Sequence, residues 1–189
     1  MTMTKTILRQ NCLERLGNSP KHNRLYKTSL VNRRVLKLLS KVKNKRILFY
    51  YPLKMEVNIL KVLYKLRKDN EIYIPFMVEQ SFKMVPFRLP LHRKKFNIYE
   101  AGNSHKDIRK IDIAIVPVVG VDGNLQRVGF GKGMYDRFFE KLQKKPYIIF
   151  TQQELCYTEK YICDSYDIAC DILLTPKKSV SKRKRKKLG

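Results

Sequence analysis

Three alternating glycines stand among charged residues in the segment Arg127-Val-Gly-Phe-Gly-Lys-Gly-Met-Tyr-Asp-Arg137. Glycine lets the backbone approach an anion closely, and the first N–H groups and the dipole of a following helix favour negative charge. Arg127 and Lys132 add positive charge, and Asp136 offers an oxygen ligand for a cation that accompanies phosphates. The segment therefore predicts a binding site for a nucleotide or another polyanion.

The alternative for this segment is a glycine-rich surface loop without a function. Such a loop has little reason to combine three alternate glycines with Arg, Lys and Asp. The segment matches neither the GxxxxGK[ST] pattern nor the GxGxxG pattern of common nucleotide sites. Residue types alone therefore predict a nucleotide or polyanion site on an α/β domain and nothing more specific.

The elements that position this segment are a strand before it and a helix after it. The apolar run Ile111–Val116 predicts a buried strand, and apolar residues spaced i, i+3, i+4, i+7 predict a helix over 134–144. We also expect helices over 3–16, 20–43 and 56–68, and strands over 47–51, 72–74, 147–150 and 172–174. The segment 82–100 should form irregular structure or short strands at a sheet edge.

This alternation predicts an α/β fold, a three-layer α/β/α arrangement with a mainly parallel sheet, in a single domain. Ligands of such sheets bind beyond the carboxyl ends of strands, where the glycine-rich segment and the residues after Tyr51 fall. We expect the domain to span 1–176 and a basic, disordered tail to span 177–189.

Composition narrows the class of protein. The 189 residues include 41 Lys and Arg against 16 Asp and Glu, a formal charge of +25. No apolar run is long enough to span a bilayer and no secretory signal is evident, so we expect a cytoplasmic protein without a membrane partner. The four cysteines form no CxxC pair, which argues against zinc and against a disulfide framework; we expect free, mostly buried thiols.

The chain resembles the 5-formyltetrahydrofolate cyclo-ligase family, also called methenyltetrahydrofolate synthetases. Val116-Pro117, Asp122 and the segment 127–138 are similar to the family's Val-Pro, Asp and Arg-Leu-Gly-x-Gly-x-Gly-Tyr-Tyr-Asp-Arg pattern. Weaker matches follow in the expected order: Lys5 with Arg9, Tyr50-Tyr51-Pro52 with Glu56, and Ser165-Tyr166-Asp167 with Asp171. The chain departs from the pattern at Leu125 (a turn glycine), Ala101 (a proline), Met134 (a tyrosine) and Tyr166 (a histidine).

The resemblance implies a ligase that converts 5-formyltetrahydrofolate to 5,10-methenyltetrahydrofolate with ATP as co-substrate and Mg²⁺. The formyl oxygen is phosphorylated and N10 closes the ring. The implied roles are catalysis by Arg127 and Lys132; ATP binding by Lys5, Arg9, Arg127, Val128, Gly129, Phe130, Gly131, Lys132, Gly133, Met134 and Tyr135; folate binding by Tyr51, Glu56, Phe130 and Met134; and metal binding by Asp136 and Asp167.

The partners expected of such an enzyme are the folate and ATP, with Arg93, Lys94 or Lys95 steering the folate's glutamate tail, in a monomer. A rival hypothesis is a basic RNA- or ribosome-associated protein that keeps the fold and contacts nucleic acid through its tail alone. A related ATP-dependent ligase, or a homologue without activity, is a third.

Overall fold

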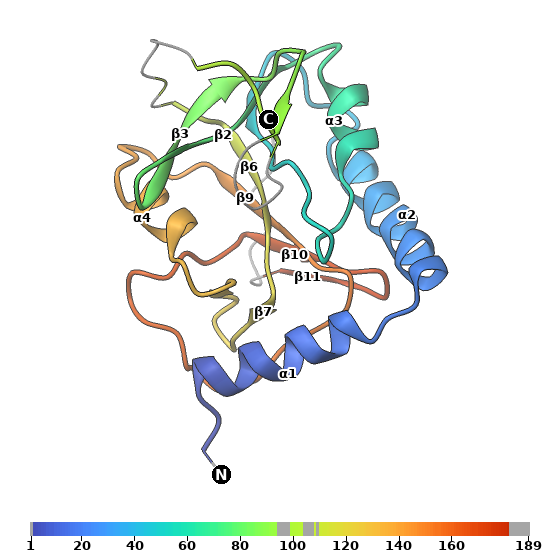
Figure 1. The fold of residues 1–189 in the computed structure, drawn as a ribbon, viewed down its shortest axis with the longest axis vertical. Helices are drawn as coiled ribbons and strands as arrows, with labels where there is room; N and C mark the ends of the chain where they lie inside the picture. The colour runs from blue at the N-terminus through green and yellow to red at the C-terminus, as the bar shows by residue number, and fades with distance from the viewer. Residues whose placement is uncertain (1, 94–98, 104–107, 109, 182–189) are drawn as a thin grey trace.

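The structure is a computed structural model that describes residues 2–93, 99–103, 108 and 110–181. Its centre is a seven-stranded sheet in the order β11-β10-β9-β6-β1-β2-β3. The bounds are β1 Arg46–Leu48, β2 Glu71–Val78, β3 Ser81–Pro86, β6 Ile113–Pro117, β9 Tyr147–Thr151, β10 Ile172–Leu174 and β11 Ser179–Ser181. The five strands from β10 to β2 run parallel, and β3 and β11 pair antiparallel at the two edges (Figure 1).

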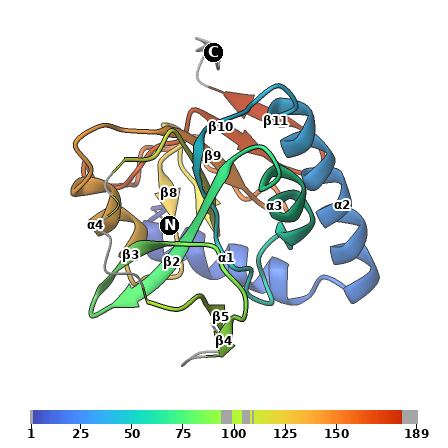
Figure 2. The same cartoon turned by 90° about the horizontal axis from the view of Figure 1, so that it is seen from above.

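Helices cover both faces of this sheet, which confirms the predicted three-layer, mainly parallel fold (Figure 2). Helices α2 (Lys21–Leu38) and α3 (Leu60–Leu66) pack on one face, with Val31, Val35 and Leu63 fully buried. Helix α4 (Met134–Glu140) packs on the other through Phe138 and Phe139. Helix α1 (Lys5–Gly17) lies across one end of the sheet. No helix among the described residues has the length and apolarity needed to cross a bilayer.

Two small hairpins accompany the main sheet. One pairs β4 (His92–Arg93) with β5 (Tyr99–Glu100), and the other pairs β7 (Gly120–Val121) with β8 (Arg127–Val128). The second hairpin follows β6 directly and delivers the glycine-rich loop, residues 129–133, to the N-terminus of α4. Lys94 and Lys95, predicted to steer the folate tail, lie outside the described residues, and Arg93 belongs to β4.

Several predicted bounds differ from those observed. The helices predicted over 20–43 and 134–144 end at Leu38 and Glu140, and the strand predicted over 47–51 ends at Leu48. The helix predicted over 56–68 begins only at Leu60, because residues 51–59 form a loop that the carboxylate of Glu56 closes on the N–H of Leu53, 2.8 Å away. The strand predicted over 72–74 continues to Val78 and returns as β3 in a hairpin. Pro75 is tolerated within β2 because β1 ends opposite Tyr73, before Pro75 is reached.

The tail that we predict to be disordered, residues 177–189, includes a short strand. Ser179–Ser181 forms β11, paired with Ile172–Leu174 of β10. The guanidinium of Arg34 in α2 holds the connection by donating to the carbonyl oxygens of Pro176 and Lys177, at 3.3 and 2.9 Å. The basic composition of the segment does not predict this edge strand. Residues 182–189 lie outside the described part of the chain.

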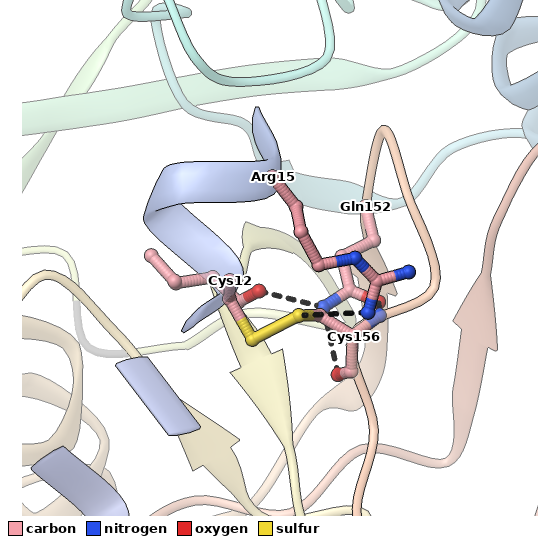
Figure 3. The surroundings of a disulfide bond; sticks show 5 residues. Cys12, Arg15, Gln152 and Cys156 are labelled. Atoms are coloured by element: carbon pink, nitrogen blue, oxygen red, sulfur yellow. Dashed lines mark hydrogen bonds between the residues drawn. A yellow bond between two sulfur atoms is a disulfide. The ribbon is translucent and has the colours of Figure 1, made fainter. Parts of the chain in front are cut away.

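The prediction of four free thiols is wrong for two of them. Cys12 of α1 and Cys156, in the loop after β9, form a disulfide (Figure 3). They are 144 residues apart in the sequence, and only the packing of α1 against β7 and β8 brings their Cα atoms within 5.7 Å. Gln152 supports the loop, since its side chain accepts from the N–H of Cys156 and donates to the carbonyl of Val119. Cys163 and Cys170 remain free thiols.

Candidate active site

A polar cavity of about 410 Å³ opens beside the glycine-rich loop. Three parts of the chain form its walls: α1, the loop with the start of α4, and the segment before β10. Its lining residues are Lys5, Arg9, Arg127, Gly129, Gly131, Lys132, Gly133, Asp136, Arg137, Glu140, Tyr166 and Asp167. Five of these carry positive charge and three carry negative charge, so the cavity suits an anion that is accompanied by a cation.

The backbone of the loop requires glycine at two positions. Gly131 has φ of 102° and Gly133, which caps α4, has φ of 58°, values that residues with a side chain rarely adopt. Neighbouring arginines hold this conformation. Arg9 Nε donates to the carbonyl oxygen of Gly129 at 2.8 Å, and Arg137 donates to the carbonyl oxygens of Lys132 and Gln80. The loop is therefore shaped before any ligand arrives.

Arg127 is the buried cation of the site, with a residue exposure of 6 %. Its Nε donates to the carbonyl of Pro117 at 3.2 Å, and its Nη1 lies 3.6 Å from a carboxylate oxygen of Asp136. The guanidinium carbon lies 4.8 Å from the ring centre of Tyr135. A Cβ atom at Gly129 would overlap the guanidinium, so the glycine leaves room for it. These four neighbours fix one orientation of Arg127.

The two predicted metal ligands, Asp136 and Asp167, both line the cavity. Asp136 accepts from the N–H of Ile168 at 3.2 Å, and Asp167 accepts from the N–H of Asp164 at 2.8 Å. Asp167 also forms an ion pair with Lys5 of α1. Burial lowers the pKa of Lys5, but the hydrogen bond and charge of Asp167 outweigh it, so the pKa ends above its usual value.

The donor set limits the metal that this cavity could hold. Within the described ranges, no three or more His, Cys, Asp or Glu side chains come together as a metal site. Two carboxylates facing an anion cavity do fit Mg²⁺, which takes one or two carboxylates and completes its shell with phosphate oxygens and water. They do not fit a closed structural zinc site, which needs four protein ligands.

Asp122 has a structural rather than a ligand-binding position. Its carboxylate is fully buried and accepts from the N–H groups of Asn124 and Gln126, both at 2.9 Å, and from those of Ile162 and Cys163 at 3.3 and 3.2 Å. These bonds close the β7–β8 turn and tie it to the segment that carries Asp167. Leu125, at the position of the family's turn glycine, adopts the left-handed conformation with φ of 57°.

Glu56 lies within electrostatic reach of the site although it does not line the cavity. Burial raises the pKa of Glu56 to about 7, against the opposing effects of the Leu53 N–H and of Arg127. Burial, and then the Glu56 carboxylate, raise the pKa of Tyr135 above its usual value. Gln153 donates to the backbone carbonyl of Glu56 at 2.7 Å and holds this loop against the end of β9.

The structure brings most of the predicted site residues together and leaves others apart. Around the cavity lie Lys5, Arg9, Arg127, Gly129, Gly131, Lys132, Gly133, Asp136 and Asp167. The others do not line it: Val128 is buried against α1, Met134 and Tyr135 pack on the α4 side of the core, Phe130 is 40 % exposed, and Tyr51 and Glu56 sit in the loop after β1.

Three lining residues received no role in the sequence analysis. Arg137 and Tyr166 stand inside the motifs that carried the resemblance, next to Asp136 and Asp167, so their sequence positions were a usable signal. Tyr166, which replaces the family's histidine, is 63 % exposed, and its hydroxyl donates to Asp164 at 2.8 Å. Nothing in the sequence indicated Glu140 as a site residue except its position one helical turn after Asp136.

Comparisons with known proteins agree on one family. The sequence profile of the 5-formyltetrahydrofolate cyclo-ligase family matches residues 1–176. A 5-formyltetrahydrofolate cyclo-ligase of Mycoplasma pneumoniae is 25 % identical over 176 residues, 91 % of this chain and 98 % of that protein. The NMR structure of Aquifex aeolicus 5,10-methenyltetrahydrofolate synthetase superimposes with a TM-score of 0.80 at 26 % identity, covering 99 % of this chain and 97 % of that one.

A second solved structure shares the fold. A 5,10-methenyltetrahydrofolate synthetase from Mycoplasma pneumoniae superimposes with a TM-score of 0.72 at 21 % identity, covering 92 % of this chain and 99 % of that one.

Proposed function

The chain belongs to the 5-formyltetrahydrofolate cyclo-ligase family, and on this premise we propose that it converts 5-formyltetrahydrofolate to 5,10-methenyltetrahydrofolate while ATP becomes ADP and phosphate, with Mg²⁺ bound. We further propose that it acts as a cytoplasmic monomer in one-carbon folate metabolism.

The observation that carries the proposal is the cavity beside the glycine-rich loop. Lys5 and Arg9 come from α1, Arg127 and Lys132 come from the distant glycine-rich segment, and all four meet two carboxylates at a loop whose glycines leave the backbone open to a ligand. Charged side chains and backbone N–H groups of this kind bind a triphosphate strongly, because each contact is charge-assisted. A volume of about 410 Å³ accommodates a triphosphate and its cation.

The chemical problem is a formamide that must lose its oxygen. We propose that the formyl oxygen attacks the γ-phosphorus of ATP, and the bond from that phosphorus to ADP breaks. The carbon then bears a phosphate leaving group. N10 attacks this carbon and gives up its proton, phosphate departs with the former formyl oxygen, and the methenyl bridge remains. This sequence needs no covalent nucleophile on the protein, only orientation of two ligands and stabilisation of charge.

The cations of the cavity take different parts in this proposal. Arg127 is buried and fixed by Pro117, Asp136 and Tyr135, so it offers positive charge without reorganisation as negative charge builds on the transferred group. Lys132 sits on the exposed side of the loop. Lys5 and Arg9 approach from α1, and binding of phosphates requires Lys5 to share or leave its ion pair with Asp167.

Asp136 and Asp167 would hold the Mg²⁺ ion, which when bound neutralises the charge of adjacent phosphate oxygens. Glu56 would bind the reduced pterin behind the loop. With a pKa near 7 its carboxyl carries a proton for part of the time at neutral pH, so it can either donate to or accept from the ring. Tyr51, Phe130 and Met134 are the proposed neighbours of the folate rings.

The proposal is tested by the absorbance of methenyltetrahydrofolate in a mixture of the purified protein and 5-formyltetrahydrofolate, with and without MgATP. Comparison of Lys132→Ala with Lys110→Ala, an exposed lysine outside the cavity, separates the loop cation from general charge. We expect product only with MgATP, and turnover lost in the first variant and kept in the second. Equal turnover in both variants would remove Lys132 from the site.

A further inference from the structure

The positive charge of the chain is concentrated in one continuous part of the sequence. Between Arg15 and Lys68 there are sixteen Lys and Arg residues and a single acidic residue, Glu56. The carboxylate of Glu56 is turned inward, where it accepts the Leu53 N–H. This stretch therefore contributes about fifteen of the 25 net positive charges, and no acidic side chain from within it offsets them at the surface.

The outer sides of helices α2 and α3 carry part of this charge, and we call them the α2–α3 face. Helices α2 and α3 lie side by side on the same side of the sheet (Figures 1 and 2). Their inner sides are buried in one core cluster, so only their outer sides meet solvent. The exposed positions on α2 and the turn after it include Lys21, Arg33, Lys37 and Lys41, and those on and after α3 include Lys61, Lys65 and Lys68.

Exposed aromatic rings lie among these cations. Tyr26 of α2 is 66 % exposed and falls on the same helical stripe as Arg33 and Lys37. Tyr64 of α3 is 43 % exposed, and its ring stands edge-on to Phe87, which limits its motion. A helix advances 1.5 Å per residue, so the stripe from Tyr26 to Lys37 is roughly 17 Å long. Cations at one-turn spacing and accessible rings are the two components of sites that bind single-stranded nucleic acid.

We propose that the α2–α3 face binds a single-stranded RNA segment, with the lysines and arginines on phosphates and Tyr26 and Tyr64 stacked on bases. Charge complementarity selects a polyanion, and the rings select one with accessible planar bases. A membrane surface fits less well. The apolar side of α2 is occupied by the sheet, and its outward side offers only Leu25 and Tyr26 for insertion into lipid.

The proposed surface is separate from the ATP site. The cavity is lined by α1, the glycine-rich loop, α4 and residues 166–167, and none of its lining residues belongs to α2 or α3. Helices α2 and α4 cover opposite faces of the sheet (Figure 2). RNA bound at the α2–α3 face would therefore leave ATP binding unchanged, and the two activities can be lost independently. The inference holds whether or not the proposed ligase reaction is correct.

The test is fluorescence anisotropy of a labelled 20-nucleotide uridine-rich RNA, titrated with the full chain at several salt concentrations. The variant Arg33→Gln/Lys37→Gln/Lys41→Gln is compared with Lys110→Gln/Lys144→Gln/Lys145→Gln, which removes the same charge in the loops before β6 and β9. We expect the first variant to bind more weakly and to reduce the slope of log K against log salt by about 2, since each lost phosphate contact on a single strand changes it by about 0.7. The control should keep its slope.

A second pair of measurements addresses the rings and the class of partner. Tyr26→Ala/Tyr64→Ala keeps every charge and should weaken RNA binding at least about fivefold, because stacking of one base is worth that much or more. Duplex RNA of the same length and phosphatidylserine vesicles should bind more weakly than the single strand, and MgATP should not compete. Equal losses in the two charge variants, an unaffected tyrosine variant, or preferential binding to vesicles or duplex would each overturn the proposal.

Discussion

The guanidinium of Arg127 lies over the backbone of Gly129, in space that any side chain at position 129 would occupy. The glycine is therefore required by the arginine beside it, while Gly131 and Gly133 are required by their backbone angles. One motif thus contains glycines that serve two different physical purposes. The arrangement also explains why the motif combines glycine with Arg127 two residues earlier.

Gly129→Ala should displace Arg127 without unfolding the protein. The guanidinium would lose its alignment with Asp136 and Pro117, and a shift of about 1 Å in a positioning group can lower turnover by roughly 10²-fold. Steady-state kinetics with varied ATP measures this effect. Gly17→Ala is the matched control, since a Cβ there meets nothing within 4 Å and turnover should be unchanged.

Asp136→Asn should reduce the effect of Mg²⁺ on the affinity for ATP. The amide oxygen can still accept the Ile168 N–H, but the negative charge beside Arg127 is lost. We expect calorimetry in EDTA to detect tighter binding of metal-free ATP, because repulsion by the carboxylate disappears, and Mg²⁺ to improve that binding less than in the wild type. Asp69→Asn, an exposed site, should behave as the wild type. An undiminished gain from Mg²⁺ in Asp136→Asn would argue against Asp136 as a ligand.

Glu56 should make stability depend on pH. The pKa of Glu56 is about 7 in the folded state, above the ordinary 4.5. Its contribution to the free energy of unfolding is therefore complete below about pH 4.5 and is lost as the pH rises through 7. Glu56→Gln stays neutral, and its stability relative to the wild type should rise by about 2 kcal/mol between pH 5 and pH 8. Denaturant unfolding without ligands measures this. A constant difference across that range, or the same trend in exposed Glu159→Gln, would contradict the assignment.

The Cys12–Cys156 disulfide should stabilise α1 against the rest of the fold. A bridge across 144 residues restricts the unfolded chain strongly, and its loss should cost about 2–5 kcal/mol. In protein purified without reductant, dithiothreitol should lower the unfolding midpoint of the wild type and of Cys163→Ser but not that of Cys12→Ser. Identical responses of all three proteins to reductant would mean that the bond is absent in solution.

The part of the site that could be predicted from the sequence is the part that is local. Residues 127–136 fold as a strand, a glycine loop and a helix start, so their side chains meet because they are neighbours along the chain. Lys5, Arg9 and Asp167 are distant in sequence, and only the family resemblance suggested that they join the loop. The structure brings all three to one cavity.

What the sequence could not predict depends on long-range packing. Cys12 and Cys156 pair only because α1 crosses the end of the sheet, and no cysteine spacing contains that information. The sequence predicts Glu56 in a helix, because the apolar spacing of the following turns extends back to Val57. In the structure its side chain instead closes a loop. Val128 lies inside the binding motif, yet alternation along β8 turns it into the core beneath α1.

The most direct measurement of the central claim follows the absorbance of methenyltetrahydrofolate formed by the purified full-length protein, with MgATP, with ATP in EDTA, and without nucleotide. The proposed phosphoryl transfer predicts product only with MgATP, with one ADP released per methenyl group, and at least about 10²-fold slower formation by Asp136→Asn. Product formation without ATP, or no product from the folded wild type under any of these conditions, would contradict it.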